Sequence, residues 1–346
     1  MANFDDMKFA VESLTGGKNT VILDDRGMPS IMVVLPKMLS SELDAAFTQT
    51  ANPAFVLNGA EKAKVYLSKF QNVVIGDRAY SLPMKDPRVN ITFDAALAAC
   101  RNKGEGWGLT PFALWSAVAL WSKKNGTMPR GNNNYGRDVN YTHEKGTPTS
   151  YDGDKVARIA TGSGPATWNH NWLPDGIADM NGNVWEWCAG MRLMNGEIQI
   201  IPYANCMDPA CDMGANSAAW KAILEDGTIV EPGTAGTLKY DYAGGKITLS
   251  TALTTQADEG RGTSFEGLGS TLASVPQIIK ELALFPNGTG YEGDHFYMNN
   301  SGERLPLRGG GWGIGANAGV FYSYLYDPRS YSNSYIGFRS AFYGDL

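Results

Sequence analysis

Short apolar runs separated by turn residues open the chain. Two β-branched runs, at residues 19–23 and 30–35, flank a turn sequence at 24–27, and this pattern predicts a β-hairpin. Pro36 ends the second run. A unit of this size has a thin core, so we expect residues 1–50 to form a small β-rich attachment module that docks on the next domain or on a partner.

The helical period appears in two later segments. Thr92 is placed to cap a helix whose apolar residues between 93 and 100 share one face. Thr110 and Pro111 supply an N-cap and a first-turn proline for a second helix, which Gly126 closes. Both helices are predicted to be core elements.

The rest of the chain predicts turns and short strands. After residue 128 it becomes polar and glycine-rich, and short apolar runs alternate with turn residues from about 190 to 300. The 43% hydrophobic content suffices for a core, whereas 41 glycines, 17 prolines and only 18% charged residues are typical of a loop-rich globular protein.

Charge and hydropathy exclude two classes of partner. A net charge of −6 is unsuited to recognition of a phosphate backbone, so nucleic acid is not expected. The first residues lack an apolar stretch, so no signal peptide is expected. No run approaches the roughly eighteen apolar residues of a membrane span, so membrane insertion is not expected.

The four cysteines are too few for a disulfide framework in a chain of this size. Cys206 and Cys211 lie close together, but no second cysteine pair or closely spaced histidine pair accompanies them. Ordinary thiols or a local disulfide are therefore favoured over a zinc site.

Residues 179–188, Asp-Met-Asn-Gly-Asn-Val-Trp-Glu-Trp-Cys, form the strongest local motif. The segment predicts a tight turn that leads into a buried strand, with Trp185 and Trp187 in or beside the core. A buried carboxylate needs a partner, because an unpaired charge in a core is costly. Glu186 is therefore expected either to accept hydrogen bonds from backbone or arginine donors, or to face a cation.

This motif resembles the formylglycine-generating-enzyme/sulfatase-modifying superfamily. Four further pieces agree in the same order: Gly-Trp-Gly-Leu-Thr-Pro at 106–111, Pro-Arg-Gly-Asn at 129–132, Leu-Arg-Gly-Gly-Gly-Trp at 307–312 and Ile-Gly-Phe-Arg at 336–339. The resemblance covers residues 51–346. It implies an α+β, C-type-lectin-like fold of the formylglycine-generating subtype, with short antiparallel sheets, two main helices and long loops.

The resemblance also implies a structural Ca²⁺ ion, because members of this superfamily often bind calcium beside the tryptophan motif. By position, its ligands are Asp179, Glu186 and the carbonyl oxygens of Gly182 and Val184. Such hard oxygen donors suit Ca²⁺. No cofactor beyond this structural ion is expected.

Catalysis is not expected. The enzyme branch of the superfamily oxidises a substrate cysteine with copper, which is bound by two cysteines between the last two motifs. Residues 311–336 contain no cysteine, so the soft ligands that Cu(I) needs are missing there. Iron-dependent relatives use a three-histidine site, whereas His143, His170 and His295 are dispersed. Neither a phosphate-binding loop nor a Gly-x-Ser-x-Gly elbow is present.

The C-terminal region, residues 307–346, has a composition suited to contact. Ten of its forty residues are aromatic, against 11% overall, and tyrosine, serine, glycine and asparagine dominate as in antibody binding loops. Tyrosines at 322, 324 and 326 alternate with Phe321, Ser323 and Leu325, so a strand here would bury one face and display the phenols. Burial of these tyrosines at a sheet interface is the competing interpretation.

Codon chemistry marks nine positions in this region. All nine residues are reachable from an AAC or AAT asparagine codon by changing adenines alone, whereas Trp312, Ala316, Phe321, Leu325, Arg329, Gly337 and Phe338 resemble a fixed scaffold. The nine expected ligand-binding positions are Gly311, Gly313, Ile314, Tyr324, Tyr326, Asp327, Tyr331, Ser334 and Tyr335. This pattern is similar to the variable proteins of diversity-generating retroelements, which include phage tail-tip receptor-binding proteins.

The second resemblance implies a non-enzymatic receptor-binding protein of a phage or prophage tail. The implied partner is a protein or glycan receptor on a cell surface, and a homotrimer is the implied assembly. The implied location is the virion, or the host cytoplasm before assembly. The alternatives are a formylglycine-generating-type oxidase and a sugar-binding lectin with a fixed site.

Overall fold

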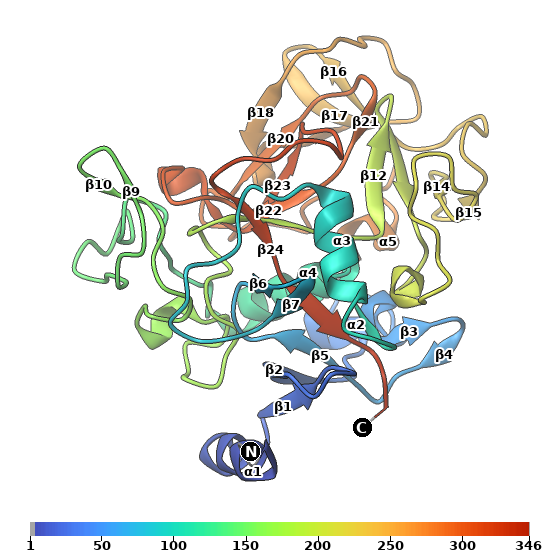
Figure 1. Ribbon diagram of the computed structural model, residues 1–346. Helices are drawn as coiled ribbons and strands as arrows, with labels where there is room; N and C mark the ends of the chain where they lie inside the picture. Colours follow the sequence, from blue (N-terminus) through green and yellow to red (C-terminus); the bar gives the residue numbers. More distant parts are fainter. Residues whose placement is uncertain (1–3, 346) are drawn as a thin grey trace.

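The computed structural model describes residues 4–345 and consists of short strands, a few helices and long connecting segments (Figure 1). This is the α+β class expected from the sequence. The described α-helices are α1 (Phe4–Thr15), α2 (Ser40–Leu43), α3 (Phe93–Arg101), α4 (Phe112–Asn125) and α5 (Gln277–Glu281). Single 3₁₀ turns are η1 (Pro53–Phe55), η2 (Ala166–Trp168), η3 (Asn205–Met207), η4 (Phe265–Gly267) and η5 (Gly315–Asn317). Within residues 4–345, no helix combines the length and the apolar character that a membrane crossing requires.

The N-terminal hairpin is part of a five-stranded sheet. Its strands, in spatial order, are β1 (Asn19–Leu23), β2 (Pro29–Pro36), β5 (Lys64–Ser68), β25 (Ser340–Phe342) and β8 (Trp107–Leu109). All neighbouring strands are antiparallel. The hairpin confirms the prediction from the β-branched runs, and Gly27 in its turn has a φ of 78°, which glycine adopts without strain.

The expected boundary at residue 50 does not separate two packing units in this structure. β2 pairs directly with β5, and Val33 and Leu35 of β2 belong to the same apolar core as Phe338 and Tyr343. Residues 4–15 form α1, which has no buried side chain. The first fifty residues therefore contain a helix that the sequence did not predict, in addition to the expected strands. An attachment role for this region stays a prediction.

A six-stranded sheet holds the tryptophan motif and the C-terminal region. Its order is β18 (Arg261–Ser264), β20 (His295–Met298), β23 (Gly319–Leu325), β22 (Leu307–Gly309), β11 (Trp185–Trp187) and β24 (Ile336–Phe338). The pairs β20–β23 and β11–β24 are parallel, and the others are antiparallel. Trp185 and Trp187 are buried in a strand, as predicted.

The remaining strands form a third sheet and three small hairpins. The third sheet comprises β12 (Met191–Met194), β13 (Glu197–Ile200), β14 (Lys221–Ile223), β15 (Ile229–Val230), β16 (Lys239–Ala243), β17 (Lys246–Ser250), β19 (Gly269–Ser270) and β21 (Glu303–Arg304). The hairpins are β3 (Val56–Leu57) with β4 (Ala60–Glu61), β6 (Val73–Ile75) with β7 (Arg78–Tyr80), and β9 (Tyr151–Asp152) with β10 (Lys155–Val156). Figure 1 shows α1 and β16 at opposite ends of the molecule.

The two helices predicted from the 3.6-residue period are α3 and α4. The Thr92 side chain accepts a hydrogen bond from the backbone N–H of Ala95, as expected of an N-cap. The second cap differs from the prediction, because Pro111 occupies the cap position and the Thr110 hydroxyl donates instead to the Arg339 carbonyl at 2.8 Å. Gly126 ends α4 in the left-handed conformation, as predicted.

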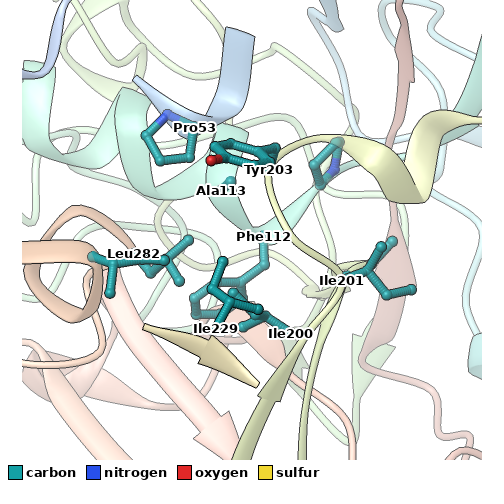
Figure 2. Close-up of a pocket in the computed structure, with 12 residues that line it drawn as sticks. Pro53, Phe112, Ala113, Ile200, Ile201, Tyr203, Ile229 and Leu282 are labelled. Carbon is teal, nitrogen blue, oxygen red and sulfur yellow. The ribbon is translucent and has the colours of Figure 1, made fainter. Parts of the chain in front are cut away.

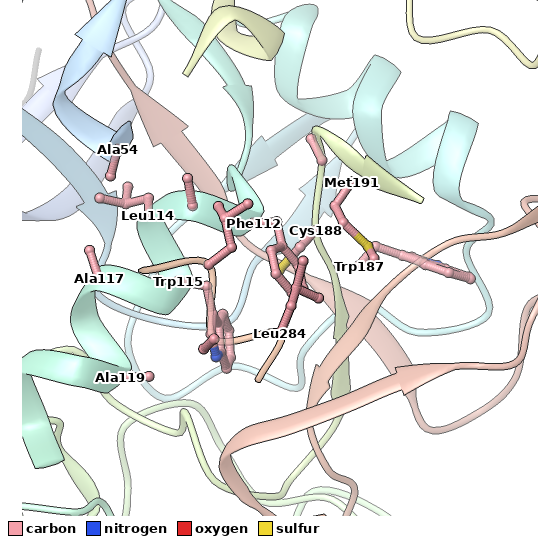
Figure 3. Close-up of a cluster of buried hydrophobic side chains, with 14 of the residues drawn as sticks. Ala54, Phe112, Leu114, Trp115, Ala117, Ala119, Trp187, Cys188, Met191 and Leu284 are labelled. Atoms are coloured by element: carbon pink, nitrogen blue, oxygen red, sulfur yellow. The ribbon is translucent and has the colours of Figure 1, made fainter. Parts of the chain in front are cut away.

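Helix α4 is buried on almost all sides and forms the centre of the core. Figure 3 shows Phe112 and Trp115 of this helix in the same apolar cluster as Trp187 and Met191. The indole N–H of Trp115 donates to the Val320 carbonyl at 2.8 Å, so the helix is tied to the strand that carries the tyrosines. Core packing thus fixes the position of β23 and of the surface that it presents.

Candidate functional site

An aromatic groove of about 340 Å³ lies on the six-stranded sheet. Six of the eleven residues that line it are aromatic, and one carries a carboxylate. The lining residues are Tyr135, Trp185, Leu307, Gly311, Trp312, Gly313, Ile314, Tyr322, Tyr324, Asp327 and Tyr335. Most of them come from the C-terminal region that the sequence marked as a contact surface.

Strand alternation builds the floor of this groove. Phe321, Ser323 and Leu325 are fully buried on one face of β23, so the tyrosines between them point to the other face. Tyr322 is itself buried and packs edge-on against Trp185, with ring centroids 4.7 Å apart. The alternative drawn from the sequence, that these tyrosines are buried, therefore holds for Tyr322, whereas Tyr324 is only half-buried.

The phenol of Tyr324 lies within a group of rings. It stacks on Tyr297 with centroids 5.2 Å apart and an interplanar angle of 7°, and its centroid lies 5.1 Å from that of Trp185. Tyr326 packs against both Tyr324 and Tyr297. Burial is the main cause that raises the pKa of Tyr324 above its ordinary value, so this phenol stays protonated at neutral pH. The aromatic faces are thus held in place before any ligand arrives.

Two loops complete the walls. The segment after β22 contributes Trp312, whose backbone carbonyl accepts a hydrogen bond from Tyr135 N–H at 2.7 Å and whose ring lies 5.3 Å from the Tyr135 ring. On the other side, the Tyr335 and Tyr331 hydroxyls are 3.2 Å apart, and Asn333 donates to the Tyr331 hydroxyl at 3.0 Å. Tyr135 and Trp185 are the two lining residues that come from far outside the C-terminal region.

The structure brings six of the nine codon-marked positions into the groove. Tyr326, Tyr331 and Ser334 do not line it, but Tyr326 contacts Tyr324, Tyr331 contacts Tyr335, and Ser334 precedes Tyr335 in the chain. The expectation that all nine face solvent is wrong for two of them. Gly311 and Asp327 are buried, and a Cβ atom at Gly311 would lie 3.1 Å from the Trp185 ring.

Asp327 is the charged group of the groove. It is 5% exposed, and within residues 4–345 its carboxylate has neither a hydrogen-bond donor nor an ion-pair partner. Burial raises the pKa of Asp327 to about 7, and the charge of Arg304 opposes this shift. A carboxylate without a donor in a folded protein is an acceptor available to a ligand.

Volume alone does not single out the groove, because hollows of about 310 Å³ beside Phe342 and about 500 Å³ beside Gln277 also occur; the first has two aromatic rings in its lining and the second has none. A further apolar pocket is far smaller. Figure 2 shows it between α4, Pro53, Tyr203 and the isoleucines at 200, 201 and 229. Its volume of about 20 Å³ is close to the space of a single water molecule. A polar pocket of about 80 Å³ beside Arg130 and Asp138 is also small.

The expected calcium ligands meet around an amide nitrogen. Nε2 of Gln71 lies 3.1 Å from the carbonyl oxygen of Asp179, 3.4 Å from that of Gly182 and 3.1 Å from that of Val184. It also lies 3.0 Å from Oε1 of Glu186. One oxygen of each of the four residues therefore lies near a single point, which is held by a hydrogen-bond donor; for Asp179 this oxygen is the backbone carbonyl and not the carboxylate.

The carboxylate of this cage is also neutralised. Nε of Arg339 donates to Oε2 of Glu186 at 2.6 Å and Nη2 donates to Oε1 at 2.5 Å, and both side chains are fully buried. The Asp179 carboxylate accepts instead from Gly162 N–H at 2.7 Å. As arranged, these residues do not fit Ca²⁺, because the position between the oxygens is filled by an N–H donor and the Glu186 charge is paired. Calcium binding here stays a prediction from the resemblance.

The Gln71 arrangement leads to a testable expectation for chelation. Because the Gln71 amide nitrogen occupies the position between these oxygens, we expect EDTA to change the melting temperature by less than about 1 °C, since a ligand that is not bound contributes nothing by mass action. Thermal denaturation with EDTA and with added millimolar CaCl₂ checks this. A rise of several degrees with CaCl₂, reversed by EDTA, would establish the calcium site and show that Gln71 moves aside.

Copper chemistry of the oxidase kind lacks ligands in the groove. The four cysteines are Cys100, Cys188, Cys206 and Cys211, all free thiols, and none lines the groove. Burial raises the pKa of Cys188 and of Cys206, so both are protonated at neutral pH. The residues that line the groove do not fit Cu(I), which prefers thiolate or thioether ligands.

Comparisons with known proteins identify similar solved structures only. No family model matches the chain, and no curated protein matches it. PvdO from Pseudomonas aeruginosa is 12% identical with a TM-score of 0.35, over 93% of this chain and 97% of that chain. Variable protein 1 of Treponema denticola is 13% identical with a TM-score of 0.35, over 94% of this chain and 98% of that chain. The P3c variant of the Major Tropism Determinant is 10% identical with a TM-score of 0.32, over 94% of this chain and 71% of that chain. By their names, two of these three are a variable protein and a tropism determinant.

Proposed function

We propose that this chain is a ligand-binding protein that contacts a receptor through the aromatic groove and its rim. One observation carries the proposal. Nine positions hold residues that arise from asparagine codons by changes at adenines alone. Six of these nine positions line a single groove, although the six span residues 311–335. Of the seven positions expected to be fixed, Phe321, Leu325, Gly337 and Phe338 are buried in the sheet beneath, whereas Trp312 and Arg329 are half-buried and Ala316 is exposed.

The groove has the physical character of a binding surface. Its rings are pre-positioned by stacking and by the core, so little rotamer entropy is lost when a partner binds. Exposed Gly313 in the lining, and exposed Ser334 and half-buried Tyr326 and Tyr331 next to lining residues, supply adaptable contacts. The proposal extends to a diversified surface, a phage or prophage tail location, a trimeric assembly and a cell-surface protein or glycan as receptor. No catalytic step is assigned to the groove.

A display library tests the proposal. The seven codon-marked positions that are not buried (Gly313, Ile314, Tyr324, Tyr326, Tyr331, Ser334 and Tyr335) are randomised with codons derived from AAC and AAT. The displayed proteins are then selected on an unrelated purified protein such as lysozyme. We expect most members to stay folded, because none of the seven side chains is fully buried, and binders to emerge.

A matched library at Trp312, Ala316, Phe321, Leu325, Arg329, Gly337 and Phe338 is the control, and most of its members should fail to fold. Two results would count against the proposal: equal loss of folding in both libraries, or folded libraries that yield no binders. For the diversified surface in particular, the gene should have a nearby near-repeat of its 3′ end that differs at adenines.

A further inference from the structure

The groove combines aromatic faces with a single acidic group, and this combination indicates the charge of its ligand. Aromatic rings attract cations electrostatically, most strongly where water is excluded. Trp185, Tyr322 and Tyr324 form one continuous group of rings, with neighbouring centroids 4.7–6.4 Å apart. Asp327 adds a buried carboxylate at the same groove.

The protein's own cations leave this acidic end of the groove free. Lys155 Nζ lies 4.5 Å from the centre of the Tyr135 ring, and Tyr135 does not belong to the C-terminal region. Arg304 pairs with Asp258 at 2.7 Å and donates to the Tyr326 carbonyl at 2.9 Å, and Arg158 pairs with Asp86 at 2.8 Å. Among residues 4–345, none of these cations forms an ion pair with Asp327.

We propose that the aromatic groove takes the guanidinium or ammonium head of an arginine or lysine side chain that projects from a protein receptor, with Asp327 as its acceptor. This inference rests on the proposed function and names the chemistry of its ligand. Arginine fits best, because its planar head stacks on rings and donates to a carboxylate at the same time. Arginine and aromatic residues are also the usual anchors of protein interfaces.

A protein source is favoured over a free small molecule by the surroundings of the groove. Serine, glycine and tyrosine continue from its edge at Gly313, Tyr326, Tyr331 and Ser334, and these are the residues that protein-binding loops use. The groove itself is at the lower end of small-molecule site volumes, about 300–1,000 Å³. One side chain fits into it with room to spare, and the rim can contact the surface from which that side chain projects.

The pKa of Asp327 gives the inference a pH dependence. Arg304 lowers this pKa, while the phenols of Tyr324 and Tyr335 lie near enough to feel the Asp327 charge. A bound cation favours the ionised carboxylate, so affinity should rise as pH increases through about 7. Stability has the opposite sign, because a carboxyl whose pKa is raised by folding stabilises the fold below about pH 4 and loses that contribution as pH rises through about 7.

Titration with small probes of matched shape tests the inference. The intact chain is titrated with N-acetyl-arginine amide and with its neutral isostere N-acetyl-citrulline amide, and the indole N–H resonances of Trp185 and Trp312 are followed by NMR. We expect the arginine probe to bind at least about tenfold more tightly at pH 8, since a hydrogen bond to a charged group contributes about 1.5–3 kcal/mol. Asp327→Asn should bring this preference below about twofold, whereas the exposed control Asp77→Asn should leave it unchanged.

Each other outcome overturns the inference. Equal binding of arginine and citrulline probes, or an unchanged preference in Asp327→Asn with a normal melting curve, removes the role of charge. Tighter binding of a methyl glycoside shows a glycan site, and tighter binding of choline shows a free quaternary ammonium ligand. In both cases the groove still binds a ligand, so the proposed function survives. Failure of the display libraries, in contrast, would remove the proposed function itself.

Discussion

Replacing Arg339 by methionine is expected to lower the free energy of unfolding by about 3–5 kcal/mol, because it leaves the Glu186 carboxylate buried without its charged partner. Arg339 donates twice to Glu186 and also to the carbonyl oxygens of Ser68 and Ala178, at 3.2 and 3.0 Å. It therefore connects β24, β11 and β5. Urea denaturation of the purified variant measures the loss.

Two comparisons make this expectation specific to the buried pair. Arg26→Met breaks an exposed pair with Asp77, at 3.5 Å, and should cost less than about 1 kcal/mol. In the double variant Glu186→Gln/Arg339→Met the buried charge is gone, so it should be more stable than Arg339→Met alone. A loss in Arg339→Met no larger than in Arg26→Met would refute a structural role for the pair.

The second large effect is expected for Trp115→Ala, which should lower the free energy of unfolding by about 3–5 kcal/mol because it opens a cavity in the middle of the core. The indole is fully buried, and a Cβ atom at Gly309 would lie 3.3 Å from it, so the glycine turn after β22 packs on this ring. The Val320 carbonyl keeps a hydrogen bond from Arg308 at 3.1 Å when the indole is removed. The loss is therefore one of packing rather than of an unsatisfied acceptor.

Calorimetric unfolding of Trp115→Ala beside Tyr151→Ala tests this. Tyr151 is 64% exposed in the β9–β10 hairpin, so its truncation should change stability by about 0.5 kcal/mol or less. Similar losses in the two variants would mean that Trp115 contributes no more than a surface aromatic residue. NMR spectra of Trp115→Ala should also show altered Tyr322 and Tyr324 signals, because β23 loses its link to α4.

The sequence predicts the local elements better than their assembly. The hairpin at 19–35, helix α3 with its Thr92 cap and the alternation along β23 follow from period, propensity and turn residues. The placement of β25 between β5 and β8 does not, because strand pairing between residues 67 and 341 depends on contacts that no local pattern encodes. For the same reason the sequence predicts the hairpin as part of a separate module, although it shares a sheet with β25 at the far end of the chain.

The candidate site divides in the same way. Tyr324, Tyr335 and Asp327 are found by composition and codon chemistry in one contiguous segment. Tyr135 and Gln71 are missed, because each reaches its site from a distant loop and belongs to no motif. Of the two partners expected for Glu186, an arginine or a cation, the structure contains the arginine, Arg339.

The position of β25 has a consequence for synthesis of the protein. β5 and β8 are joined only through this strand, so their sheet cannot close until the ribosome has added residues 340–342. A frameshift anywhere between residues 311 and 335 replaces β24, Arg339 and β25 together, and such a chain lacks the pieces that complete two sheets. In such a chain the edges of β5 and β8 that β25 covers stay unpaired, so we expect it not to reach this fold.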